Sequence, residues 1–146
     1  MIGGSLSAIE HIKTAAEARA VLVNLLPVGV AAHTSLLAAA SKGFEAELRR
    51  SALAAPTVPV LAGIDSLPVR GRARAIEKLS CQISTPIDWI ACMEAAVEMG
   101  CKVFLELGPG YRLARMARDF YPGLTVRSVE EFRSLSGVIE WVHKHS

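Results

Sequence analysis

The sequence has little of several features that would assign it to a familiar class of protein. Aromatic residues make up only 5%, and the three cysteines, Cys81, Cys92 and Cys101, form no C-x-x-C pair. An odd number of cysteines without such a pair argues against a disulfide framework and against a zinc site. We therefore expect cysteines that are small buried hydrophobic residues in a reducing compartment.

Long apolar runs and a leader-like start are also missing. No apolar stretch is long and uninterrupted enough to cross a bilayer, which takes about 20 residues. The first residues, MIGGSLSAIEHIK, lack both the basic and the apolar region of a signal peptide. These features predict a cytoplasmic protein without a membrane partner.

Charge of one sign does not dominate, since the net charge is only +2. The densest basic group, PVRGRARAIEK, has no interleaved aromatic residues, which a nucleic-acid surface would require. We expect no nucleic-acid binding here. The group is better interpreted as a solvated face that suits an acidic partner.

What the sequence does have is enough apolar material, 51% of 146 residues, for one ordinary domain. Helix-like and strand-like segments alternate along it, which favours an α/β fold with a mostly parallel sheet. The predicted helices lie at 7–18, from about 34 to 50, and at 73–83, 88–99, 111–120 and 136–145, and the predicted strands at 20–28, 55–63, 102–108 and 124–129.

Two short motifs could carry chemistry. GGSLSA resembles a G-x-S-x-G nucleophile turn around Ser5, but Ser7 replaces the last glycine, and no strand precedes the turn. Ser7 with Glu10 instead predicts a helix cap. In VFLELGPGYR, Glu106 and the glycines could hold S-adenosylmethionine, or simply form a tight strand-to-helix turn with a glycine at positive φ.

A third candidate is His33, in the apolar run LLPVGVAAHTSLLAAA. A histidine in such surroundings is either a core residue with satisfied hydrogen bonds or a positioned base. Four segments in order, LPVGVAAHTS, PTVPVLAG, CQISTPIDW and FLELGPG, resemble the C-terminal half of the malonyl-CoA:acyl-carrier-protein acyltransferase family. The tail VRSVEEFRSLSGVIEWV looks most like the malonate decarboxylase epsilon subunit, a member of that family.

The resemblance implies a fold and a division of the chain. Residues 1–28 would end a small ferredoxin-like subdomain, and residues 29–146 would form the C-terminal part of the large hydrolase-like α/β subdomain. His33 would be the general base of a Ser–His dyad, oriented by the backbone carbonyl of Gln82. The family's G-H-S-x-G nucleophile lies far upstream of the histidine, whereas only 32 residues precede His33. We therefore expect a fragment that is inactive alone.

The implied reaction is malonyl transfer from malonyl-CoA to the thiol of an acyl carrier protein, without a metal or cofactor. In the malonate decarboxylase setting, the acceptor is a phosphoribosyl-dephospho-CoA-type group on the carrier subunit, and the other decarboxylase subunits are partners. Two alternatives stay open: a small S-adenosylmethionine-binding domain centred on residues 106–110, and a non-catalytic assembly domain.

Overall fold

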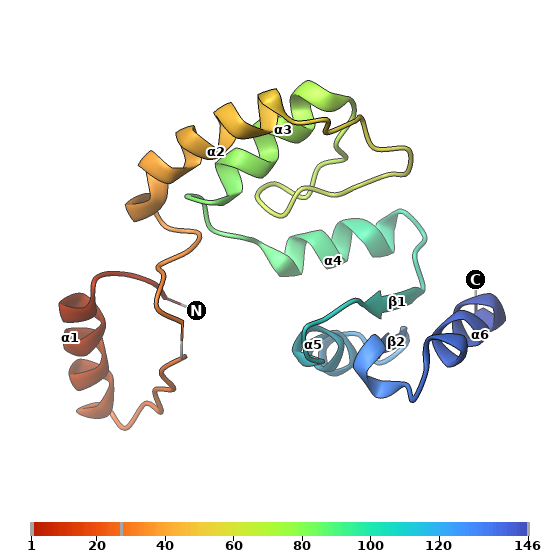
Figure 1. Ribbon diagram of the computed structural model, residues 1–146. Coiled ribbons are helices and arrows are strands. Elements are labelled where there is room, and N and C mark those ends of the chain that lie inside the picture. Colours follow the sequence, from red (N-terminus) through yellow and green to blue (C-terminus); the bar gives the residue numbers. More distant parts are fainter. Residues whose placement is uncertain (1, 27, 146) are drawn as a thin grey trace. The chain divides into compact units, whose positions relative to one another are not determined.

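The computed structural model describes residues 2–26 and 28–145 (Figure 1). The chain divides into two compact units, Met1–Cys92 and Met93–Ser146, and each is described by itself. The predicted boundary at residue 28 stays a prediction. The elements, in order, are α1 (Leu6–Glu17), the 3₁₀ turn η1 (Ser35–Leu37), α2 (Ala38–Arg50), α3 (Arg72–Gln82), α4 (Trp89–Glu98), β1 (Val103–Glu106), α5 (Arg112–Phe120), β2 (Thr125–Ser128), η2 (Val129–Glu131) and α6 (Leu135–His145).

The first unit is built on the packing of α2 against α3. The side chain of Ile76, in the middle of α3, is fully buried. Ala75 in α3 forms a small core with Ala62 and Val69 from the preceding loop. Lys78 of α3 also pairs with Asp65 of that loop and holds the pKa of the aspartate below its usual range. Apolar burial and this ion pair together fix the loop on the helix.

Two strands predicted in the first unit are wrong. Within 55–63 only Leu61 pairs, in an isolated antiparallel bridge with Pro68. Pro56 and Pro59 lack the N–H groups that a ladder needs, which explains why no strand extends through them. Residues 21–26 have no regular secondary structure, since a strand needs a pairing partner and no described segment pairs with them. Pro27 of the predicted strand lies outside the described residues.

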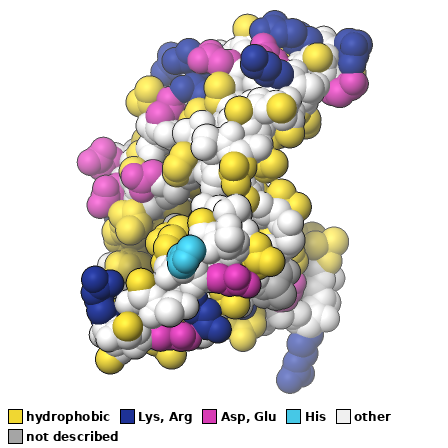
Figure 2. All heavy atoms as spheres, turned by 90° about the vertical axis from the view of Figure 1, so that its left-hand side faces the viewer, with side chains coloured by type: hydrophobic (Ala, Val, Ile, Leu, Met, Phe, Trp, Pro, Cys, Tyr) yellow, Lys and Arg dark blue, Asp and Glu magenta, His cyan; other side chains and the backbone are white. Residues whose placement is uncertain are grey.

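Helix α1 begins at Leu6, one residue before the predicted start. Its N-cap is Ser5, whose hydroxyl accepts from the amide of Ala8 at 3.3 Å, so the predicted cap at Ser7 is wrong. None of the helix residues is buried, and Ile12 of its apolar stripe is 43% exposed. Hydrophobic side chains are exposed over much of the face shown in Figure 2.

The second unit follows the sequence prediction closely. Strands β1 and β2 pair in parallel, with Val103 opposite Thr125 and Glu106 opposite Ser128. Helix α5 connects them and buries two alanines, Ala114 and Ala117, against the sheet. The alternation of elements therefore confirms the predicted mixed α/β fold with a parallel sheet and flanking helices.

The cysteines depart from the prediction in one respect. All three are free, but Cys81, in the last turn of α3, and Cys101, three residues after α4, are exposed instead of buried. In the described part of the chain, no helix is both long enough and apolar enough to span a membrane.

Arg72, the first residue of α3, closes the C-terminal end of α2. Its guanidinium donates to the backbone carbonyls of Leu48, Arg49, Ser51 and Leu53, at 3.3, 2.7, 3.2 and 2.8 Å. The last carbonyls of a helix have no partner within the helix, and a cation there also interacts favourably with the helix dipole. Arg72 therefore joins α2, the following loop and α3.

We predict that Arg72→Gln lowers the free energy of unfolding by roughly 1–3 kcal/mol, because several charge-assisted hydrogen bonds are lost. Arg70→Gln is the matched control, since Arg70 is exposed and makes no ion pair with a described residue. Urea denaturation followed by circular dichroism measures both variants. Equal midpoints for the two variants would contradict the role assigned to Arg72.

Candidate active site

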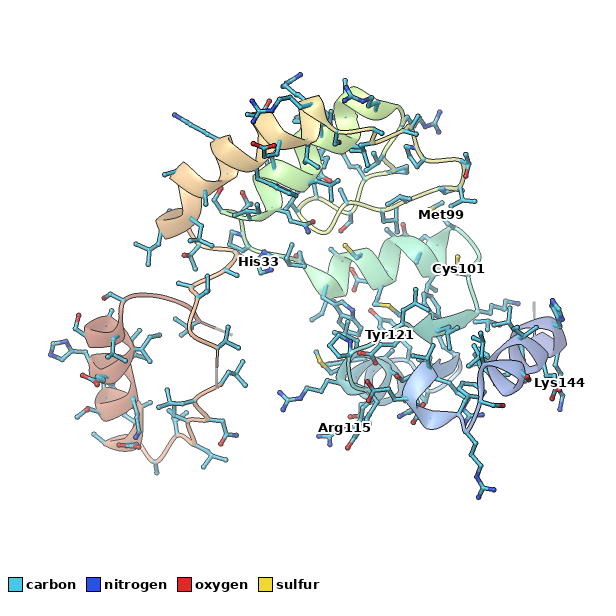
Figure 3. The ribbon with its side chains drawn as sticks, viewed as in Figure 1. His33, Met99, Cys101, Arg115, Tyr121 and Lys144 are labelled. Atoms are coloured by element: carbon cyan, nitrogen blue, oxygen red, sulfur yellow. The ribbon has the colours of Figure 1, made fainter. Side chains whose placement is uncertain are left out.

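His33 lies two residues before η1 and meets the C-terminal end of α3 (Figure 3). Its backbone N–H donates to the carbonyl of Ile83 at 2.9 Å. Its ring Nδ1 lies 2.6 Å from the carbonyl oxygen of Gln82. The hydrogen bond predicted between His33 and Gln82 is therefore present, and a second bond, to Ile83, adds to it. The catalytic role of the two residues stays a prediction.

The partner of Nδ1 determines the tautomer of the ring. A backbone carbonyl can only accept, so Nδ1 must carry the proton. In the neutral ring Nε2 then keeps a free lone pair, as a general base requires. Nε2 makes no hydrogen bond with any residue that the structure describes. A histidine of the core would have both ring nitrogens buried against apolar side chains. In His33, one ring nitrogen bonds to a backbone carbonyl instead.

The backbone of His33 adopts an unusual conformation. Its φ is +61°, in the left-handed region that non-glycine residues seldom occupy. The two bonds to Gln82 and Ile83 hold it there. Left-handed backbone at a non-glycine residue is often found at functional positions, where the surrounding structure compensates for the strain.

The helix end that receives His33 is itself fixed by α2. The hydroxyl of Ser41 in α2 donates to the carbonyl of Ser80 at 2.6 Å. Ser80 is buried, and its own hydroxyl donates back to the carbonyl of Ile76 at 2.7 Å. The position of the Gln82 carbonyl is thus set by the α2–α3 packing. Sequence reasoning missed Ser41 and Ser80, since nothing in their local sequence marks them.

The segment after Gln82 is also held in place. Asp88, for which the sequence suggested no role, accepts from the amide of Ala91 at 3.0 Å and so caps α4. Its own amide donates to the carbonyl of Gly63 at 2.9 Å. A Cβ added at Gly63 would lie 3.1 Å from Ile87. An aspartate just before a helical segment was the sequence signal for this cap.

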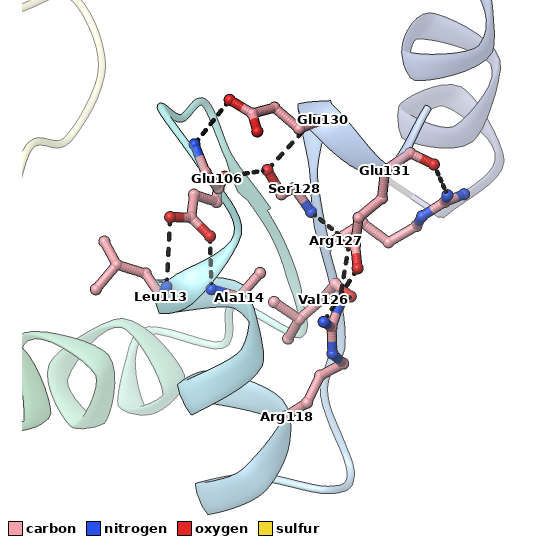
Figure 4. A network of polar contacts seen from close by, with 10 residues as sticks. Glu106, Leu113, Ala114, Arg118, Val126, Arg127, Ser128, Glu130 and Glu131 are labelled. Atoms are coloured by element: carbon pink, nitrogen blue, oxygen red, sulfur yellow. Dashed lines mark hydrogen bonds and ion pairs between the residues drawn. The ribbon is translucent and has the colours of Figure 1, made fainter. Parts of the chain in front are cut away.

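The turn after β1 uses its acidic residues to satisfy backbone amides (Figure 4). The carboxylate of Glu106 accepts from the amides of Leu113 and Ala114, at 3.3 and 2.7 Å, in the first turn of α5. The carboxylate of Glu130 accepts from the amide of Gly110 at 2.7 Å. These amides would otherwise be the donors for an anionic ligand. The geometry therefore favours the tight structural turn over the S-adenosylmethionine site.

Glu131 completes the same network. Its carboxylate pairs with Arg118 of α5 at 3.1 Å and accepts from the amide of Ser128 at 2.8 Å. The Arg118 guanidinium, helped by the Ser128 amide, holds the pKa of Glu131 below its usual range. The hydroxyl of buried Ser128 donates to the carbonyl of Gly110 at 2.7 Å. The network joins β2, α5 and the turn.

The remaining candidate residues do not form a second site among the residues that the structure describes. Ser5, the possible nucleophile, is exposed and caps α1. Groups of three or more histidine, cysteine or acidic side chains able to hold a metal ion are absent from residues 2–26 and 28–145. The His33–Gln82 pair is therefore the strongest candidate site.

A substitution at Gly108 tests whether the turn needs a glycine. The φ of Gly108 is +87°, and a Cβ at this position would contact other atoms only at ordinary distances of 3.5 Å or more. The penalty for a side chain is therefore backbone strain. We predict that Gly108→Val lowers the free energy of unfolding by about 1–3 kcal/mol. Gly123→Ala, where nothing lies within 4 Å and φ is not positive, is the control in the same urea titration. An unchanged midpoint for Gly108→Val would refute the strained turn.

Glu131 should make stability depend on pH in the acid range. Its folded pKa lies below its unfolded value, so its contribution is present above about pH 4.3 and is lost as the pH falls through the folded pKa. We predict that Glu131→Gln destabilises the protein at pH 7 and that the difference from the parent shrinks at pH 3. Urea unfolding at both pH values measures this difference. Glu140→Gln, on an exposed position of α6, should leave the difference near zero at each pH.

The sequence of this chain is similar to those of known proteins. No protein-family model matches it. It is 29% identical over 140 residues to the malonyl CoA-acyl carrier protein transacylase of Salmonella typhimurium, which covers 95% of this chain and 45% of that protein. The same enzyme of Mycobacterium bovis is 32% identical over 127 residues, covering 87% of this chain and 42% of that one.

The fold shows the same likeness. The crystal structure of an acyl-carrier-protein S-malonyltransferase from Burkholderia pseudomallei superposes with a TM-score of 0.82 at 28% identity, covering 94% of this chain and 45% of that one. The chain thus spans less than half the length of these relatives and matches their C-terminal half. The predicted resemblance to malonyl-CoA:acyl-carrier-protein acyltransferases is confirmed at this level, and the predicted α/β architecture is that of the C-terminal part of acyltransferase structures.

Proposed function

We propose that this chain carries the base of an acyltransferase that moves a malonyl group from malonyl-CoA to an acyl carrier protein. The observation that carries the proposal is the ring of His33, with Nδ1 on the carbonyl of Gln82 and Nε2 free of described partners. The likeness to malonyl CoA-acyl carrier protein transacylases supplies the substrate and the acceptor. Neither observation would suffice alone.

The chemistry follows from the lone pair on Nε2. A serine hydroxyl attacks the thioester carbonyl of malonyl-CoA while Nε2 takes its proton, and the imidazolium then protonates the departing coenzyme A thiolate. The product is a malonyl ester on the serine. In the second half, Nε2 takes the proton of the carrier thiol, which attacks the ester, and returns it to the serine oxygen. Base and nucleophile are both regenerated.

The backbone at the end of α3 suits this role without a carboxylate. The carbonyl of Gln82 fixes the ring orientation and the tautomer, and the bond from the His33 amide to Ile83 fixes the main chain. Carbonyls at a helix C-terminus carry partial negative charge, which complements a ring that becomes positive during the reaction. The nucleophilic serine itself is not in this sequence, which contains no G-H-S-x-G. In our proposal another segment supplies that serine.

We further propose that the enzyme is of the malonate decarboxylase epsilon-subunit type. The sequence of β2, η2 and α6, VRSVEEFRSLSGVIEWV, supports this assignment by its resemblance to the end of that subunit. The acceptor thiol would then belong to a phosphoribosyl-dephospho-CoA-type group on a carrier subunit. A general fatty-acid-type carrier with a phosphopantetheine thiol is the comparison substrate that separates the two types.

A chimera tests the function. We would join residues 1–146 to the N-terminal part of the Burkholderia pseudomallei enzyme, in place of the part that this chain matches. The chimera should transfer malonyl groups and show a malonyl adduct by intact mass, whereas the 146-residue chain alone should show none. In the chimera, His33→Ala should lower kcat by roughly 10²–10⁴, the range for loss of a general base. His11→Ala, on exposed α1, should leave it unchanged.

A second variant separates the base from a purely structural role. His33→Asn keeps a side-chain N–H able to reach the Gln82 carbonyl, and asparagine tolerates a positive φ better than most residues. We expect the Asn variant to keep its stability and lose its rate. A folded chimera that is inactive, or one in which both His33 variants keep the parent rate, would overturn the proposal.

A further inference from the structure

The turn that carries His33 is closed by the residue that follows it. Ala32 and His33 occupy the two central positions of a turn between Ala31 and Thr34. The hydroxyl of Thr34 donates to the carbonyl of Ala31 at 2.7 Å, across this turn. The φ of His33 is +61°, a conformation that glycine and asparagine adopt most readily at this position of a turn. A histidine there therefore depends on contacts that hold the turn closed.

Thr34 also stands at the N-cap position of η1, but its hydroxyl does not cap that helix. Its backbone is extended, and its side chain accepts no hydrogen bond from the described amides of η1. A threonine at an N-cap ordinarily accepts from an amide of the first turn. Other side chains of this protein do make that bond at the start of a helix: Ser5, Asp88, Ser128 and Ser134. Helix capping therefore does not explain the hydroxyl of Thr34.

The methyl group of Thr34 makes a separate contact with the N-terminal segment. A Cβ added at Gly3 would lie 3.1 Å from Cγ2 of Thr34, which is closer than side chains normally approach. The backbone of Gly3 therefore lies directly against this methyl group. Because the methyl group and the hydroxyl share one Cβ, packing the methyl against Gly3 favours the rotamer in which the hydroxyl faces Ala31.

The conformation of the turn determines where the ring of His33 lies. The bonds from His33 to Ile83 and Gln82, at 2.9 and 2.6 Å, join it to the end of α3, and the Thr34 hydroxyl acts on the opposite side of the turn. A left-handed backbone is unfavourable for a residue with a Cβ. If the turn opened and φ became negative, the ring would move away from Gln82, and Nδ1 would lose the acceptor that keeps its proton. Part of the molecules would then carry the proton on Nε2, which could not act as a base.

We infer that Thr34 is a positioning residue for the candidate base: its hydroxyl, bonded to the carbonyl of Ala31, holds His33 in the left-handed conformation that places Nδ1 on Gln82. The consequence for the reaction rate rests on the proposed function, whereas the consequence for the tautomer of His33 does not. Thr34 acts through His33 and needs no contact with the reacting atoms. A side chain with the hydroxyl and without the methyl group should therefore serve, and one with methyl groups alone should not.

The tautomer of His33 tests the inference in the 146-residue chain. Nitrogen-15 NMR of the imidazoles distinguishes protonated from unprotonated ring nitrogens, in alkaline solution where histidine rings are neutral, and the His33→Asn variant identifies the signals of His33. We expect the Nδ1–H tautomer alone in the parent and in Thr34→Ser, and a mixture of both tautomers in Thr34→Val. Thr14→Val is the matched control and should leave the tautomer unchanged, because the hydroxyl of Thr14 also donates to a backbone carbonyl, that of Glu10 at 3.1 Å, on exposed α1.

The rate of the chimera supplies a second readout. Thr34→Val should lower kcat by roughly 10- to 100-fold, because a misplacement of about 1 Å at a reacting group can cost 10²-fold. Thr34→Ser should restore most of the parent rate. Urea midpoints are measured for both variants, since a threonine with a purely structural role would lower the midpoint without changing the tautomer of His33.

The two readouts separate this inference from the proposed function. An inactive chimera, together with the expected change of tautomer in Thr34→Val, would refute the proposed function and leave the inference standing. An active chimera in which Thr34→Val keeps the parent kcat would overturn the inference alone. A parent chain with both tautomers at His33, a Thr34→Val chain that keeps the parent tautomer or does not fold, or a Thr34→Ser chain that loses the parent tautomer would each overturn it as well.

Discussion

Helix ends leave backbone groups without partners inside the helix, and in this protein side chains from other elements satisfy them. At the C-terminal end of α3, the carbonyls of Ser80 and Gln82 accept from Ser41 and His33. At the end of α2, carbonyls accept from Arg72. Each of these bonds joins two elements, so the contacts that complete the helices also fix how the first unit packs.

The second unit solves the complementary problem at an N-terminus. The first amides of α5 donate hydrogen bonds to the carboxylate of Glu106, and the amide of Gly110 donates to the carboxylate of Glu130. This arrangement decides what the glycine turn can do. A helix start whose donors are already paired with carboxylates has little left to offer an anionic ligand. Glu106, the acidic residue that suggested a ligand site in the sequence, holds the turn instead.

The candidate base belongs to the same class of contacts. His33 would be an ordinary helix-capping residue if only Nδ1 mattered, and it is the other nitrogen that gives it a chemical role. Because the orienting group is a backbone carbonyl, no acidic side chain is needed near the ring. The precision of the site then depends on α3 ending at the right place, which Ser41 and the buried Ser80 ensure.

The sequence by itself determined the elements whose periodicity and caps are local. Helices α3, α4, α5 and α6 and strands β1 and β2 lie within a few residues of their predictions, and the ordered motifs indicated both His33 and Gln82. Only the tertiary structure decided the rest. Residues 21–26 and 55–63 read as strands but pair with no described sheet, since a strand needs a neighbour that local sequence cannot supply. The bonds to Ile83, Ser80 and the carbonyls around Arg72 involve backbone atoms that every residue has, so no residue type marks them in advance.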